Sequence, residues 1–271
     1  MRAISTFKRV STDIGEIQHR ITTGQRINSG KDDPGGLVIR EALRADIKSI
    51  HATQAGMMQA ESQMDVATSG MLQLLELLQG PDPSDPSNGG LLGALYAGST
   101  DESTAKVTTK AAAEEFMTLY DSVVASTKYN NAKLLEGVTK TYQLGGGQTL
   151  SVTLSDLTTT SGGAEDLKTA VTAIASDTTI AAAITEAEKL VATISGALGT
   201  LGNSQKVVAT NQKLLDTRLT SVTAAEGRIS NADIAVESSR MARAELLAQN
   251  AMSSIMYTRN YAAFAVTSLF R

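Results

Sequence analysis

The amino-acid sequence predicts a mainly α-helical protein with one small β-hairpin. Apolar residues recur at spacings of three and four residues over long stretches at both ends of the chain, which is the period of one helix face. Residues 140–157 instead carry β-branched residues on either side of a glycine run, which is typical of a hairpin. Aromatic residues make up only 4% of the chain, a composition that suits closely packed helices.

The first helix is expected over the N-terminal 23 residues, and an irregular joint follows it. The apolar stripe of this helix consists of Ile4, Phe7, Val10, Ile14, Ile17 and Ile21. Gly24 interrupts the stripe, and residues 26–36 have no apolar periodicity. Asp32 or Asp33 is expected to cap the next helix, with Pro34 at its first position.

Helical spacing resumes over residues 37–79. Three of the four prolines then fall within residues 80–90, which are expected to form a surface loop because proline interrupts helices. A further helix is expected at about 101–126, followed by a turn at residues 130–131. After the hairpin, the Ala- and Thr-rich residues 164–196 are expected to be helical.

The last third of the chain carries the most regular pattern. From Leu198 to Val236, twelve positions alternate spacings of three and four residues, and eight of them are apolar. The pattern predicts one long helix whose polar seam positions weaken its pairing and leave it in need of further partners. A helical pattern continues from Arg240 to about Met256. The residues expected in the bundle core are Leu215, Leu219, Val222 and Ile229.

Both ends of the chain are thus expected to be amphipathic helices without a core of their own. Such helices must pair with each other or with neighbouring copies to bury their apolar stripes. The residues expected to make these contacts are Ile4, Phe7, Val10, Ile14, Ile17, Ile21, Met241, Leu246, Leu247, Phe264, Leu269 and Phe270.

Composition argues against several classes of function. The net charge of −4 is too small to indicate a nucleic-acid partner. The absence of Cys excludes disulfides, thiol catalysis and Cys-ligated zinc. No apolar run approaches the roughly 20 residues of a transmembrane helix, and the N-terminus lacks the apolar segment of a Sec-type signal peptide. His19 and His51 have no metal-binding spacing, so we expect no catalytic residue, metal site or cofactor.

Several blocks of the sequence resemble the bacterial flagellins. The stretch from Arg26 to Leu37 is similar to the N-terminal signature of that family, and its joint residues here are Arg26, Asn28, Asp32 and Asp33. Further similar blocks, in the family's order, are residues 129–135 before the hairpin, 198–205 at the start of the last long helix, and 228–233, 241–249 and 268–271 near the C-terminus. The chain departs from the family in the aromatic residues of 257–266 and in the proline-rich loop.

The resemblance implies a rod-shaped subunit of the flagellar filament. An inner coiled-coil domain would comprise residues 1–33 and 232–271, and an outer helical bundle with the hairpin would comprise residues 34–231. No outer variable domains are expected. Subunits would polymerise head-to-tail into a helical tubular filament for swimming motility. They would be secreted out of the cell without a cleaved signal peptide, and a secretion chaperone and cap or junction proteins would be further partners.

Other functions remain as alternatives. The opening Met1-Arg2 and the Asp32-Asp33-Pro34 motif are also similar to the paralogous hook–filament junction protein, which joins rather than propagates. A coiled-coil hairpin could instead serve adhesion or signalling, in which case the free monomer would have ordered ends. A hydrolase would have to use the Asp32 and Asp33 carboxylates, although helix capping is their simpler role. The filament subunit is the leading hypothesis, without enzymatic activity or membrane insertion.

Overall fold

The computed structural model describes residues 2–80, 89–99, 103–160 and 163–269, with side chains described for 4–80, 89–99, 106–160 and 163–260. The described chain forms seven helices and two small antiparallel hairpins, which confirms the predicted fold class. The expected loop at 80–90 lies largely outside the described residues. No helix within the described ranges combines the length and apolarity needed to cross a membrane.

The chain divides into two compact units. Unit 1 comprises Met1–Lys48 and Thr217–Arg271, and unit 2 comprises Ser49–Asp216. Two helix breaks lie within unit 1: α1 spans Arg2–Thr23 and α2 begins at Pro34, while α6 ends at Ser230 and α7 spans Ile234–Leu269. The division at residues 33/34 and 231/232 stays a prediction.

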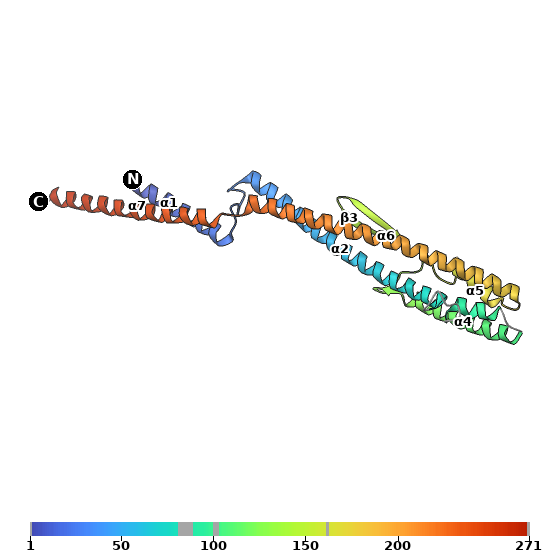
Figure 1. Ribbon diagram of the computed structural model, residues 1–271. Helices are drawn as coiled ribbons and strands as arrows, with labels where there is room; N and C mark the ends of the chain where they lie inside the picture. Colours follow the sequence, from blue (N-terminus) through green and yellow to red (C-terminus); the bar gives the residue numbers. More distant parts are fainter. Residues whose placement is uncertain (1, 81–88, 100–102, 161–162, 270–271) are drawn as a thin grey trace. The chain divides into compact units, whose positions relative to one another are not determined.

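In unit 1, the terminal helices pair with each other. α1 lies beside α7, with the two chain ends at the same end of the pair (Figure 1). Val10, Ile17 and Ala244 are buried between them. The partly buried residues that pack around these three are Ile14, Ile21, Met241 and Ala248. The predicted stripe of α1 therefore faces α7.

In unit 2, α2 (Pro34–Gln79) supplies a regular stripe of large core side chains. The buried members at steps of seven residues are Ile50, Met57, Met64, Met71 and Leu78. A repeat of seven keeps these side chains on one face of the helix. The unbranched methionines adapt to the irregular space between neighbouring helices. The predicted helix at 37–79 is confirmed, and Met57, Met64 and Met71 are core residues, whereas Met58 is exposed.

The polar seam positions of α6 (Asp177–Ser230) have partners within unit 2. Gln205 donates a hydrogen bond to Asp65 at 2.9 Å, and Gln212 donates one to Glu61 at 3.2 Å. Between them, Val208 is buried, as are Leu201 and Leu215 at neighbouring seam positions. The glutamines therefore do not lie unpaired in the seam, because carboxylates on α2 accept their hydrogen bonds.

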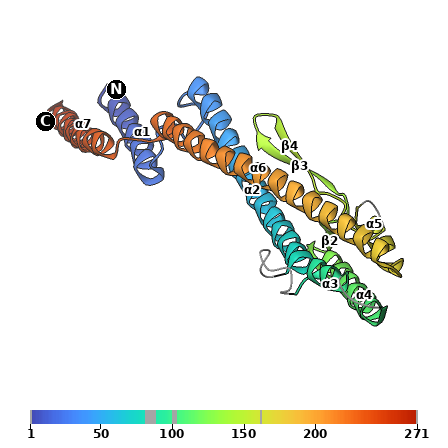
Figure 2. The same ribbon diagram turned by 45° about the vertical axis from the view of Figure 1, so that its right-hand side comes forward.

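The strands of the described residues form two hairpins, one of them expected. β3 (Thr139–Gly145) pairs with β4 (Gln148–Thr153) around a turn in which residues 145–147 have positive φ, as the glycine run predicts. A Cβ at Gly145 would contact the side chains of Leu215 and Thr53, and the hairpin accordingly lies beside α6 in both views (Figures 1 and 2). The predicted turn at Asn130 and Asn131 joins the two-residue strands β1 (Lys128–Tyr129) and β2 (Ala132–Lys133).

Two helix predictions need correction, and one helix was not expected. The helix expected at about 101–126 is confirmed as α4 (Ser103–Ser126), and the unexpected α3 (Leu91–Gly98) precedes it. The helix expected at 164–196 breaks between α5 (Gly163–Thr172) and α6, where the hydroxyl of Thr179 accepts hydrogen bonds from the backbone of residues 175 and 176. The long helix expected through Val236 ends at Ser230, and α7 begins anew at Ile234.

Candidate functional site

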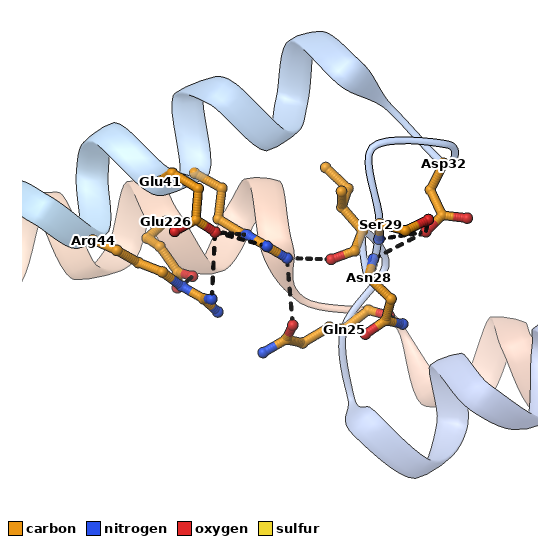
Figure 3. A network of polar contacts seen from close by, with 9 residues as sticks. Gln25, Asn28, Ser29, Asp32, Glu41, Arg44 and Glu226 are labelled. Atoms are coloured by element: carbon orange, nitrogen blue, oxygen red, sulfur yellow. Dashed lines mark hydrogen bonds and ion pairs between the residues drawn. The ribbon is translucent and has the colours of Figure 1, made fainter.

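The signature segment folds into a compact joint between α1 and α2 in unit 1. Gly24, with φ of 66°, ends α1 in the left-handed conformation that glycine accepts without strain. Asp32 then folds the loop back, because one of its carboxylate oxygens accepts hydrogen bonds from the backbone of Asn28 and Ser29 at 3.1 and 2.9 Å (Figure 3). The bonds from Ser29 and then Asn28 hold the pKa of Asp32 below its ordinary value.

The start of α2 follows from the residue after this loop. The Asp33 carboxylate accepts a hydrogen bond from the backbone of Gly36 at 2.9 Å, and Pro34 is the first residue of the helix. This arrangement confirms the predicted cap, with Asp33 in that role. Gly36 leaves room for its neighbours, because an added Cβ would lie 2.6 Å from the end of the buried Ile27 side chain and would displace it. Both carboxylates of the Asp32–Asp33 pair are thus engaged by backbone donors.

The α1–α2 linker pairs with the α6–α7 linker, also within unit 1. Arg26 donates its backbone N–H to the carbonyl of Ser230 at 2.6 Å, and Ala232 donates to the carbonyl of Gly24 at 2.9 Å. The Arg26 guanidinium donates two further bonds, of 3.3 and 3.0 Å, to the carbonyl of Ile229. These bonds satisfy carbonyls that the end of α6 leaves without helical partners. Two segments far apart in sequence are thereby tied together.

Arg40, near the start of α2, binds the loop that precedes this helix. Its side chain is only 8% exposed and donates hydrogen bonds to the carbonyl of Ile27 and, at 3.4 Å, to the side-chain oxygen of Gln25. It also donates to one oxygen of Glu41 at 3.1 and 2.8 Å, and these bonds lower the pKa of Glu41. Nearby, Arg44 pairs with Glu226 of α6 at 2.9 Å (Figure 3).

Sequence reasoning missed Arg40, although a local signal for it exists. The residue lies four positions after Gly36 and three before Leu43, on the inward face of α2. A charged residue at an inward position of an apolar repeat requires polar partners. The loop carbonyl of Ile27 is such a partner, but nothing in the local pattern identifies it.

The residues expected to make contacts at the chain ends fall into three groups. Val10 and Ile17 are buried between α1 and α7, and Phe7, Ile14, Ile21 and Met241 are partly buried. Ile4, Leu246 and Leu247 are exposed, at 62%, 59% and 56%. Phe264, Leu269 and Phe270 lie outside the residues with described side chains. Intramolecular pairing therefore covers only part of the apolar surface of these helices.

The residues expected in the bundle core are buried to different degrees. Leu215 is buried in unit 2, while Leu219, Val222 and Ile229 are half-buried in unit 1. Among the described residues, no three His, Asp or Glu side chains gather in a way that could hold a metal ion. The polar groups of the joint instead bond to backbone and to one another.

Comparison with known proteins identifies the class to which this helical architecture belongs. Residues 1–140 match the model of the bacterial flagellin N-terminal helical region, and residues 182–268 match that of the bacterial flagellin C-terminal helical region. The chain therefore belongs to the bacterial flagellin family, and it is a structural subunit of the flagellar filament. The family implies export, self-polymerisation into the filament and association with other flagellar components.

Individual relatives agree with this assignment. Flagellin FljO of Caulobacter vibrioides is 29% identical over 280 residues, covering 99% of this chain and 95% of the relative. The flagellin of Halalkalibacterium halodurans is 26% identical, with coverages of 93% and 90%. A Vibrio parahaemolyticus structure assigned as a flagellar hook-associated protein shares the fold, with a TM-score of 0.61 at 10% identity over 74% of this chain and all of that chain.

Proposed function

We propose that the α1–α7 pair of unit 1 is the principal self-assembly surface through which subunits add head-to-tail into a helical tubular filament for swimming motility. The observation that carries this proposal is the exposure of Leu246 and Leu247 on α7, together with Ile4 on α1. Large apolar side chains that a single helix pair leaves in water mark an interaction surface. A head-to-tail contact that does not close on itself produces an open helical polymer.

The proposed contact set is the one expected at the chain ends. Val10, Ile17 and Met241 join α1 to α7 within a subunit. Ile4, Leu246 and Leu247 then contact neighbouring copies. The joint residues Arg26, Asn28, Asp32 and Asp33 hold this pair at the ends of α2 and α6, and they act as structural rather than catalytic groups. No catalysis is part of the proposed role.

Substitutions on α7 test the surface directly. Leu246→Asp should prevent elongation on filament seeds, because assembly would bury an unpaired charge. Gln249→Asp is the matched control, since it adds the same charge at an exposed position that is already polar. Electron microscopy of seeded samples measures filament length. Normal elongation of the Leu246 variant, or an equal loss in the Gln249 variant, would contradict the proposal.

The ends of the free subunit give a second test. Residues 1–33 and 232–271 should exchange their amide hydrogens rapidly in the monomer and slowly in the filament, because the α1–α7 pair leaves part of its apolar surface without a partner before assembly. Deleting 232–271 should abolish filaments while unit 2 stays folded. Protected ends in a proven monomer would refute this behaviour and would favour the adhesion or signalling alternative.

The hook–filament junction role is the competing assignment within the same class. A junction protein joins two structures and does not propagate, so purified protein would bind filament seeds without extending them. Repeated elongation from seeds supports the filament subunit instead. Export without a cleaved signal peptide, and binding of a secretion chaperone and of cap or junction proteins, belong to the same proposal. The mass of the N-terminal peptide from isolated filaments tests the first of these.

A further inference from the structure

The methionines with described side chains differ sharply in their exposure. Those in the helical core of unit 2 are buried: Met57, Met64 and Met71 on α2, and Met117 on α4. Met241 is half-buried against α1. Three others are open to solvent, namely Met58 at 58% on α2, and Met252 at 48% and Met256 at 64% on α7. Since thioethers react with oxidants according to their accessibility, these two groups should differ in reactivity.

Met252 and Met256 remain open to solvent although α7 packs on α1. The face of α7 that packs on α1 carries Met241, Ala244 and Ala248, and Ala251 is buried one turn further on. Because Met252 and Met256 are four residues apart, they lie one above the other on the same side of the helix. Pairing with α1 therefore leaves both thioethers uncovered.

The sequence around this pair indicates that something else covers it. Residues 246–269 contain one charged side chain, Arg259, within 24 residues. A helix with so few charges is normally buried on more than one side. If α7 is the assembly surface, further copies of this chain supply the cover, and the inference below rests on that proposed function.

We infer that Met252 and Met256 form an oxidation-sensitive pair through which a peroxide blocks addition of the subunit to the filament. The O–O bond of the peroxide breaks, the thioether sulfur takes up one oxygen, and the other oxygen leaves as water or an alcohol. The flexible apolar side chain becomes a polar sulfoxide. Packing such a group against apolar neighbours costs free energy unless a donor meets it.

Because of this exposure pattern, oxidation should affect assembly of the subunit and not its folding. The methionines of the unit 2 core are buried, so a dose of peroxide that modifies α7 leaves that core intact. Within a filament, Met252 and Met256 are covered and react slowly. The sensitive period is therefore the time before a subunit is incorporated. Methionine sulfoxide reductases reverse the modification, so the block is reversible.

The experiment begins with the unmodified full-length protein. Monomer treated with hydrogen peroxide and then quenched is mapped by peptide mass spectrometry and added to untreated filament seeds. Met252 and Met256 should be modified before Met57, Met64 and Met71. Elongation measured by electron microscopy should fall by at least about tenfold, which corresponds to about 1.4 kcal/mol. Treatment with sulfoxide reductases should restore it, and the two methionines should react more slowly in assembled filaments.

Two variants assign the effect to these residues. The double substitution Met252→Leu with Met256→Leu keeps the apolar volume and removes both sulfurs, so elongation should survive the same dose of peroxide. Met58→Leu, which removes an equally exposed thioether from α2, should remain as sensitive as the unmodified protein.

Three outcomes would overturn the inference. Oxidised protein could elongate normally, the double variant could lose elongation as steeply as the unmodified protein, or reductase could fail to restore growth. The second outcome would assign the effect to Met241 or another site. Untreated protein that never elongates would instead refute the proposed function itself, so the two failures are distinguishable.

Discussion

Replacing Arg40 with Met should loosen the joint of unit 1. Arg40→Met keeps the apolar stem but removes the donors that reach the carbonyl of Ile27, whose residue is 1% exposed. Leaving a buried carbonyl unsatisfied costs about 1–3 kcal/mol. The lost bonds to Glu41 add little, because its carboxylate is exposed and screened by solvent. The opening equilibrium of the joint should therefore rise by about 5- to 150-fold.

Hydrogen exchange measures this opening directly. The amides of Arg26 and Ala232 donate the bonds that tie the two linkers, so both should lose protection in Arg40→Met filaments. Arg44→Met is the matched control on the same helix. Its bond to Glu226 is short, at 2.9 Å, but the Arg44 side chain is more exposed than that of Arg40. The opening equilibrium of the joint should therefore change by less than about fivefold. Unchanged protection in Arg40→Met, or an equal loss in Arg44→Met, would refute this account.

Three further predictions concern the remaining helices. Leu219→Asp should lower the melting temperature by placing a charge at a half-buried apolar position, and an unchanged melting temperature would show that this face is open to solvent. Burial raises the pKa of Tyr120 far above its ordinary value, so the folded chain keeps a proton that the unfolded chain releases above pH about 10. Stability should fall as the pH rises through that range, and urea titrations should show a smaller fall for Tyr120→Phe. Gly70→Ala should destabilise α2, because its Cβ would lie 2.5 Å from the Thr127 hydroxyl. Gly56→Ala meets nothing within 4 Å and should stabilise the protein by up to about 1 kcal/mol. Thermal melts should show a lower melting temperature for the Gly70 variant and a higher one for the Gly56 variant.

The sequence predicts the elements of this fold better than the contacts between them. The stripe from Ile4 to Ile21 identifies α1 because helical periodicity is a local property. The cap at Asp33 is likewise local, since its acceptor and donor lie three residues apart. The break after Ser230 does not interrupt the three-four spacing, so periodicity alone continues the helix through it. Asp233 marks the restart, because it accepts hydrogen bonds from the backbone of residues 235 and 236.

The contacts of the joint, in contrast, join residues far apart in sequence. The Arg26 side chain bonds to the carbonyl of Ile229, which is 203 positions away in sequence. Backbone acceptors carry no residue identity, so neither partner reveals the other in the sequence. The burial of Arg40 depends on the same loop carbonyls. The sequence pattern therefore finds the segment that forms the joint but does not show what this segment holds in place.

The pairing of the two linkers makes the N-terminal joint a late product of chain synthesis. The backbone bonds of Gly24 and Arg26 to the α6–α7 linker can form only after the chain has grown past Ala232. A chain that stops before this point contains α2 and nearly all of α6, but it cannot form the hydrogen bonds between the α1–α2 and α6–α7 linkers. Closing so long a loop carries an entropic cost that only the finished chain can offset. Truncated copies therefore lack the bonds between the two linkers that a full-length subunit has.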